Sequence, residues 1–206
     1  QTDKCHYCSE YPYRHLIMPV VFRMIYMCGL RVSEARLLKV GDVDLEKGIL
    51  TIKHSKKANS RLVPMSDYLS QLCRQYSKKA HPFPVPEDYY FPAQEGKPMT
   101  IGNVYKNFRK FLWRAGISHG GRGYGPRVHD FRHVYAVHCL KKWVEQEKDL
   151  TAYLPVLKTY MGHDSFQDTA YYLRLTADVF PNITLKLETH YPEIIPELGG
   201  SADETY

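Results

Sequence analysis

The chain has 206 residues, of which 44% are apolar and 24% charged, and these values are typical of a globular domain with one sizeable core. No stretch approaches the apolar run that a membrane-spanning helix needs, so no membrane partner is expected. The net charge is +6, but residues 188–206 hold five of the 22 acidic residues and none of the 28 basic ones. Residues 1–187 therefore carry about +11, which favours a polyanionic partner such as nucleic acid over a merely solvated surface.

The five cysteines are odd in number and irregularly spaced, which indicates reduced thiols in a cytoplasmic protein. Cys5 and Cys8 could form half of a zinc site, but no second CxxC pair follows. We therefore expect no metal unless further ligands precede residue 1. The N-terminus does not resemble a signal peptide and lacks an initiator methionine, which is consistent with a fragment of a longer protein.

The predicted elements begin with helices and continue with strands. Pro19 is suited to the first turn of an apolar helix that ends at Gly29, and Ser33 can cap a short second helix. The spacing of apolar residues then changes to the alternation typical of strands, and a polar turn joins two of them. The strands are expected at residues 43–45, 49–53 and 61–64, with the turn at 55–60.

Helical periodicity returns in the second half of the chain. Ser66 and Thr100 can each cap a helix, and the Pro-rich segment 81–92 between those helices predicts a loop. Residues 116–126 contain five glycines and one proline and predict a second loop, which is not a phosphate-binding P-loop. Further helical segments are expected around 127–148, 152–161, 167–175 and 183–187. The fold class is thus mainly α with a small antiparallel β-sheet (α+β).

Two places in the sequence can hold a phosphate group. His129 and Arg132 are three apart in a helical pattern, so both project from one face, where they suit two non-bridging oxygens. The alternative is a surface pair on a basic helix, with His133 and His138 nearby as packing or surface residues. Arg31 precedes a positive helix N-terminus, a position easier to understand if it faces an anion, and Glu34 can hold it in place. A simple surface Arg–Glu pair is the alternative.

Three further positions can transfer protons or attack. A turn lysine at Lys56 can serve as a proton donor, with Lys57 as an immediate rival. His163 follows Gly162 at a helix end, and Tyr172 lies nine residues later, beside Tyr171 as its rival. A phenol is a weak nucleophile because its pKa is about 10, and it becomes plausible when several cations hold the transition-state charge. Together these groups could attack a phosphodiester without a metal.

These motifs resemble the tyrosine recombinases, the phage-integrase family. Residues 28–35 resemble the first catalytic box, 55–64 the β-hairpin, 128–133 the second box, and 160–172 the third box with the nucleophile. The family lysine stands five residues before the Arg of the Arg-Leu-Val-Pro segment, and the usual histidine–tyrosine gap is nine. The resemblance thus selects Lys56 and Tyr172.

The resemblance also implies a fold, the catalytic domain of a DNA breaking-rejoining enzyme, and a role for each residue. Tyr172 would form a 3′-phosphotyrosyl link, Lys56 would protonate the leaving oxygen, and His129 would assist proton transfer. Arg31 and Arg132 would bind the non-bridging oxygens of the phosphate, and His163 would add a further phosphate contact. Glu34 would support Arg31. No cofactor, ATP or metal is implied.

The expected partners are double-stranded DNA and other protomers in a tetrameric synapse, in a bacterial cytoplasm or encoded by a phage or transposon. Residues 1–187 would form the catalytic domain, without the N-terminal DNA-binding domain usual in the family. The acidic tail 188–206 would dock on a neighbouring protomer or fold back. Type IB topoisomerase-like relaxation and a catalytically silent DNA-binding module are the rival functions.

Overall fold

The computed structural model describes residues 2–5, 13–53, 60–121, 124–163, 169, 171–173 and 175–176. The chain divides into two compact units, Gln1–Tyr135 and Ala136–Tyr206. The predicted boundary between a domain at 1–187 and an acidic tail lies outside the described residues, as does the predicted segment 183–187.

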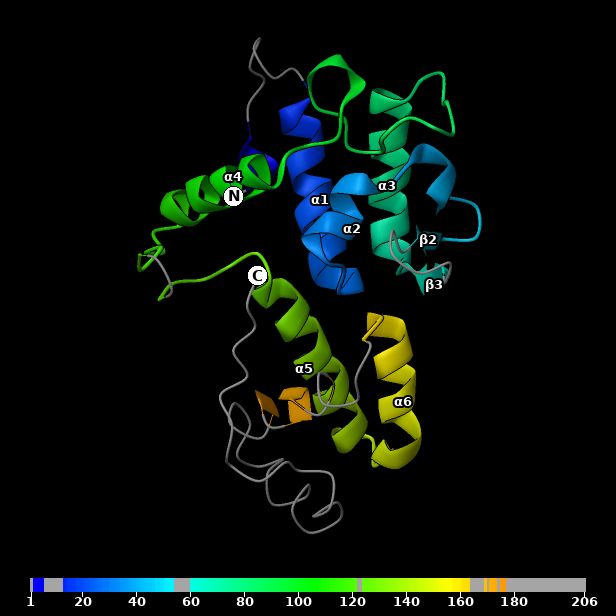
Figure 1. Cartoon of the computed structure of the whole chain (residues 1–206), viewed down its shortest axis with the longest axis vertical. Coiled ribbons are helices and arrows are strands. Elements are labelled where there is room, and N and C mark those ends of the chain that lie inside the picture. Colours follow the sequence, from blue (N-terminus) through cyan, green and yellow to red (C-terminus); the bar gives the residue numbers. More distant parts are fainter. Residues whose placement is uncertain are drawn as a thin grey trace. The chain divides into compact units, whose positions relative to one another are not determined.

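The first unit is mainly helical and contains one small sheet (Figure 1). The observed architecture confirms the predicted fold class. In chain order its helices and strands are α1 (Arg14–Cys28), α2 (Val32–Leu37), β1 (Val43–Asp44), β2 (Ile49–Lys53), β3 (Ser60–Pro64), α3 (Asp67–Ala80), α4 (Ile101–Arg114) and the first residues of α5 (Asp130–Glu145). Short 3-10 helices lie at η1 (Thr2–Lys4), η2 (Val40–Asp42) and η3 (Gln94–Gly96).

Helix α1 forms the centre of the first unit and begins five residues earlier than predicted. Pro19 lies inside the helix and not in its first turn. A proline removes one backbone donor, and the apolar side chains of Ile17 and Met18, both buried, favour continuing the helix through it. The helix ends as predicted at Gly29, whose φ of 60° is left-handed.

The three strands form one antiparallel sheet in the order β1-β2-β3. In the β2–β3 pair Leu50 lies opposite Val63, and Ile52 lies opposite Arg61. Leu50, Ile52 and Val63 are buried. Leu62, which lies between Arg61 and Val63 in β3, is exposed. Since side chains alternate along a strand, Arg61 lies on the buried face of the sheet.

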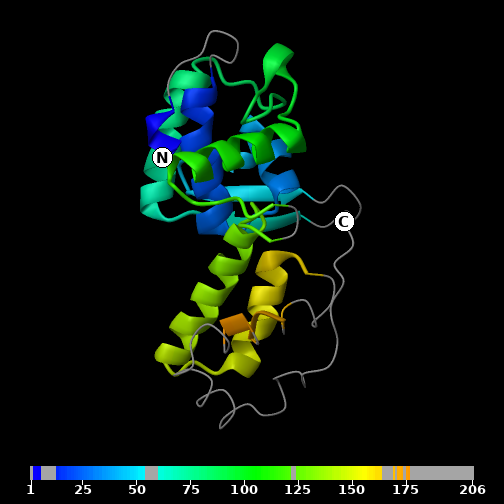
Figure 2. The ribbon, with the colours of Figure 1, turned by 90° about the vertical axis from the view of Figure 1, so that its left-hand side faces the viewer.

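Helices α3 and α4 complete the first unit, and both begin at their predicted caps. The Ser66 hydroxyl accepts a hydrogen bond from the backbone N–H of Leu69, and Thr100 accepts one from Asn103. Helix α3 packs against α1, and α4 crosses α1, as Figure 2 shows. An aromatic cluster holds the crossing, because the Phe22 ring of α1 lies about 6 Å from three others: Phe108, Phe111 and Phe131.

The second unit contains the rest of α5, helix α6 (Leu150–Met161) and a short helical stretch among residues 169–176. The side chain of Asp149 caps α6 by accepting from the Thr151 N–H at 2.9 Å, so the helix begins two residues before the predicted start. At its end Gly162 is left-handed, and the His163 N–H donates to the Lys158 carbonyl. Among the described residues no helix is long and apolar enough to cross a membrane.

Candidate active site

The structure places the predicted site residues in both units. Arg31, Glu34, His129 and Arg132 belong to the first unit, and His163 and Tyr172 belong to the second. Lys56 and its rival Lys57 lie outside the described residues, in the gap between Lys53 and Ser60. The chemical roles assigned to all of these residues stay predictions.

Arg31 and Glu34 meet at the start of α2. The N-cap of α2 is Arg31 and not Ser33, as the sequence had suggested. The reason is that the Glu34 carboxylate reaches back and accepts the Arg31 backbone N–H at 2.8 Å, which starts the helix before Ser33. The same carboxylate accepts from Arg31 Nη1 at 3.0 Å. The contact that the sequence predicted between these side chains is therefore present.

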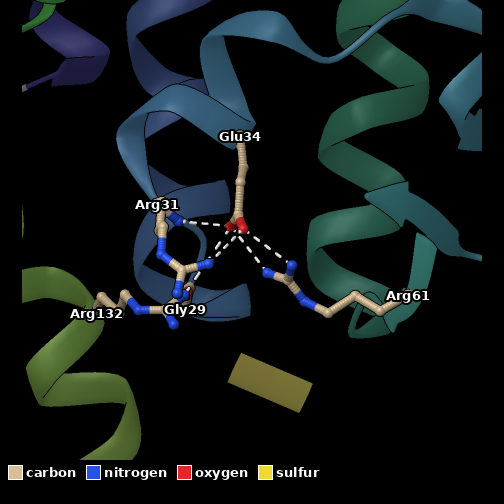
Figure 3. Close-up of polar contacts among 5 residues, drawn as sticks. All are labelled: Gly29, Arg31, Glu34, Arg61 and Arg132. Atoms are coloured by element: carbon tan, nitrogen blue, oxygen red, sulfur yellow. Dashed lines mark hydrogen bonds and ion pairs between the residues drawn. The ribbon is translucent and has the colours of Figure 1, made fainter. Parts of the chain in front are cut away.

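Arg61 is the residue of this cluster that the sequence analysis did not single out. Its Nη1 and Nη2 atoms donate to Oε1 and Oε2 of Glu34 at 2.9 and 2.8 Å, which makes a planar two-bond pair (Figure 3). The side chains of Arg61 and Glu34 are only 9% and 8% exposed. The available signal was the alternation of β3, which puts an arginine on the same face as the buried Val63.

Arg132 approaches the same carboxylate from α5. Its side chain is 1% exposed, and Nη1 donates to the Gly29 carbonyl at 2.6 Å and lies 4.0 Å from Glu34 Oε2. Gly29 ends α1, so this carbonyl belongs to the negative end of a helix dipole, which favours a cation. A buried guanidinium is thus held by a helix terminus and a carboxylate together.

The cluster of Arg31, Glu34, Arg61 and Arg132 (Figure 3) carries three positive charges and one negative charge. Burial alone would raise the pKa of Glu34. The hydrogen bond and charge of Arg61, the Arg31 N–H and the charge of Arg132 outweigh burial and lower that pKa below 4.5. Glu34 is therefore ionised at neutral pH, and the cluster is suited to bind an anion with several oxygens.

His129 immediately precedes α5 and is half-buried, with its ring 4.6 Å from that of His133. Burial, followed by the charges of His133, Arg132 and Arg127, lowers the pKa of His129 from 6.5 to about 4, against the opposing charge of Asp130. The imidazole is therefore neutral near pH 7 and can accept a proton.

His163 and Tyr172 contact each other in the second unit. Their rings stack with centroids 5.6 Å apart and an interplanar angle of 18°, and His163 Nδ1 lies 2.9 Å from the Thr169 hydroxyl. Tyr172 is 3% exposed, whereas the neighbouring Tyr171 is 44% exposed. The predicted nucleophile is thus the buried tyrosine of the pair, oriented by an imidazole.

A metal site is not formed by the described residues, which contain no group of three or more His, Cys, Asp or Glu side chains suited to one. Cys5 is half-buried, and its possible zinc partner Cys8 lies outside the described residues.

The resemblance seen in the sequence is confirmed by comparison with known proteins. A model of the Phage integrase family matches residues 3–178, so the chain belongs to that family. It is 32% identical over 194 residues to "Putative integrase/recombinase y4rB" of Sinorhizobium fredii, an alignment that covers 92% of this chain and 61% of the relative. The chain therefore spans only about three-fifths of that relative's length.

Solved structures share the fold. The XerH site-specific recombinase, in a post-cleavage complex with its palindromic difH substrate, superposes with a TM-score of 0.65 at 22% identity, over 91% of this chain and 49% of that one. The catalytic domain of bacteriophage HP1 integrase superposes with a TM-score of 0.51 at 20% identity, over 92% and 89% of the two chains. Both identify the fold as that of a tyrosine recombinase catalytic domain.

We expect Gly29→Ala to lower the free energy of unfolding by about 2–4 kcal/mol, because a left-handed alanine is strained and its Cβ would add overpacking. That Cβ would lie 2.6 Å from Cδ1 of Tyr135. Urea unfolding measures the change. The control is Gly102→Ala, where the added Cβ meets nothing within 4 Å, and it should change stability by at most about 1 kcal/mol. Equal effects of the two substitutions would contradict this account of Gly29.

We expect His129 to titrate near pH 4, which NMR of the labelled imidazole would measure. Because the pKa is lower in the folded state, the unfolded chain binds the proton first. The free energy of unfolding should therefore fall as the pH is lowered from 6.5 to about 4, and His129→Gln should remove this part of the dependence. His138→Gln, on the exposed side of α5, is the control. A midpoint near 6.5 would contradict the assignment.

Proposed function

We propose that the chain is the catalytic domain of a site-specific tyrosine recombinase of the integrase or transposase type, which cleaves and rejoins DNA strands through a covalent 3′-phosphotyrosyl intermediate. The observation that carries this proposal is the cluster of Arg31, Arg61 and Arg132 around Glu34. The side chains of Arg61, Arg132 and Glu34 are buried, whereas that of Arg31 is 34% exposed. Three guanidiniums around one carboxylate retain a net positive charge at a largely buried site, where a phosphate is bound more strongly than in open water.

The proposed chemistry needs no external energy source. The Tyr172 phenol oxygen attacks the scissile phosphorus, the bond from phosphorus to the 5′-oxygen breaks, and the tyrosine proton passes to a base. His129 is the proposed base, because its imidazole is neutral near pH 7 and can accept a proton. Lys56 donates a proton to the leaving 5′-oxygen, and attack by another strand's 5′-hydroxyl reverses these steps and releases the tyrosine.

The charge that develops on the phosphate is stabilised by the proposed cation set. Arg31 and Arg132 bind the non-bridging oxygens, and His163 adds a further contact. Glu34 supports Arg31 through the side-chain and backbone hydrogen bonds described above. A tyrosine can serve as the nucleophile under these conditions because the cations offset the weak nucleophilicity of a phenol.

A basic face on α4 supports DNA as the substrate. Lys106, Arg109, Lys110 and Arg114 are all exposed on this helix, together with the ring of Trp113. The opposite face is buried in the first unit through Val104, Phe108 and Phe111. Lysine and arginine side chains that are exposed on one helix face suit the phosphates of a duplex, and the net charge of residues 1–187 has the same sign.

The wider setting is part of the same proposal. Residues 1–187 would act as the catalytic domain, in the cytoplasm of a bacterium, on DNA of a mobile element such as a phage or transposon. Four protomers would assemble on two duplexes, with the tail 188–206 docked on a neighbour through its apolar residues in an acidic context.

The direct test is to capture a covalent protein–DNA adduct. The chain is incubated with a library of nicked suicide duplexes and analysed on a denaturing gel, and the captured DNA is sequenced. We expect an adduct that Tyr172→Phe lowers on the order of 10³-fold or more and that Tyr171→Phe retains. Loss only in Tyr171→Phe would overturn the choice of nucleophile.

The same gel separates the rival functions. Duplex binding without any adduct would indicate a silent DNA-binding module and contradict strand cleavage. If the chain forms an adduct and relaxes supercoiled DNA but never joins two duplexes, the topoisomerase reaction is indicated instead.

The α4 face makes an independent prediction about DNA affinity. The double variant Lys110→Gln/Arg114→Gln should weaken binding of every duplex to a similar degree and reduce the slope of log K against log salt by about 2. Binding titrations by fluorescence anisotropy at several salt concentrations measure both quantities. Lys78→Gln/Lys79→Gln removes the same charge from the exposed end of α3 and should leave the slope unchanged. Equal slopes for both double variants would contradict α4 as the contact surface.

A further inference from the structure

Arg61 occupies a position that none of the proposed chemical steps uses. It lies on β3 opposite Ile52, on the buried face of the sheet, and both of its Nη atoms donate to the Glu34 carboxylate at 2.8–2.9 Å. The planar guanidinium and the planar carboxylate fix each other in both distance and orientation, which a single lysine contact would not do. The pair is therefore a rigid link between β3 and α2.

The Glu34 carboxylate also holds the arginine proposed to bind phosphate. It accepts the Arg31 N–H at 2.8 Å and Arg31 Nη1 at 3.0 Å, and Arg132 Nη1 lies 4.0 Å away. One carboxylate thus faces guanidiniums from three elements, α2, β3 and α5 (Figure 3). Any rotation of Glu34 would displace Arg31.

Arg61 also changes what Glu34 does to an arriving anion. A buried carboxylate repels a phosphate and competes with it for Arg31 and Arg132. The charge and the two hydrogen bonds of Arg61 offset that repulsion and occupy both oxygens of the carboxylate. Without Arg61, the ion pair between Arg132 and Glu34, now 4.0 Å long, would be able to shorten and take Arg132 away from the phosphate.

The strand next to β3 is fixed in a similar manner. Lys53, at the end of β2, pairs with Asp42 Oδ1 at 2.5 Å, and the buried Asp42 accepts the Lys39 N–H at 3.1 Å. Lys53 lies opposite Ser60, one residue before Arg61. Each strand thus places a basic side chain on a buried carboxylate at the same end of the sheet, and the Lys53 pair is the weaker one because its side chain is 66% exposed.

From these contacts we propose that Arg61 is a positioning residue for strand cleavage, which acts through Glu34 to hold Arg31 and to leave Arg31 and Arg132 available to the scissile phosphate. This inference rests on the proposed function. Arg61 is assigned to positioning and not to DNA contact because both of its Nη atoms donate to the two oxygens of Glu34.

The test is a double-mutant cycle on the rate of adduct formation at saturating suicide duplex. We expect Arg61→Gln to slow the reaction on the order of 10²-fold with little change in the duplex concentration at half-saturation, since misplaced groups mainly affect the chemical step. Arg61→Lys, which keeps the charge but loses the planar pair, should recover part of the rate. Leu62→Gln, on the exposed face of the same strand, is the matched control.

The double variant Arg61→Gln/Glu34→Gln decides between positioning and direct contact. If Arg61 acts through Glu34, the double variant is no slower than the slower single variant. If the two fold-losses multiply, or if Arg61→Gln mainly raises the half-saturating duplex concentration, Arg61 contacts DNA by itself and the proposal is overturned. If the unsubstituted chain forms no adduct, the failure lies in the proposed function.

A pH profile separates positioning from general loss of structure. Arg61 lowers the pKa of Glu34, so Arg61→Gln should raise that pKa and move the part of the acidic fall that Glu34 contributes to higher pH, apart from the titration of His129 near pH 4. The shift should disappear in the double variant. An unchanged profile would contradict the proposal. Thermal unfolding of every variant sets a temperature at which all are folded, and Arg61→Lys carries the comparison if Arg61→Gln fails to fold.

Discussion

The Glu34 carboxylate holds the arginines of the candidate site in the first unit in place. It is buried, and it faces arginines from α2, β3 and α5. A buried ion pair is costly to form, and removing one partner commonly costs about 3–5 kcal/mol because the other charge is left uncompensated. The arrangement is therefore a weak source of stability but a strong constraint on geometry, and it makes the sheet, the first helices and the start of α5 one electrostatic unit.

Features that depend on neighbours in sequence were predictable. The Ser66 and Thr100 caps, the strand periods and the contact of Arg31 with Glu34 are all signalled within three or four residues. The start of α1 was predicted wrongly, because Pro19 resembles a first-turn residue and only burial against the rest of the unit shows that the helix continues through it.

Features that depend on distant parts of the chain were not predictable. Arg61 lies 27 residues from Glu34, and Arg132 lies 103 residues from the Gly29 carbonyl. The role of Arg61 follows from the register of the sheet, and that of Arg132 from the position of the end of α1 beside α5. Local sequence patterns do not predict either of these arrangements. The sequence therefore identified Arg132 as a candidate without its anchor, and it noted Arg61 only as part of a motif. The placement of Lys56 still rests on the sequence alone.

The burial of Arg132 has a consequence for affinity. Arginine is among the side chains that lose most rotamer entropy on immobilisation, and ordering one at an interface costs about 0.5–1.5 kcal/mol. Arg132 is held at its guanidinium by the end of α1. Its side-chain entropy is lost when the first unit folds and not when an anion binds. The loss of rotamer entropy therefore reduces the free energy of unfolding of the first unit. It does not reduce the free energy that electrostatic attraction contributes to phosphate binding.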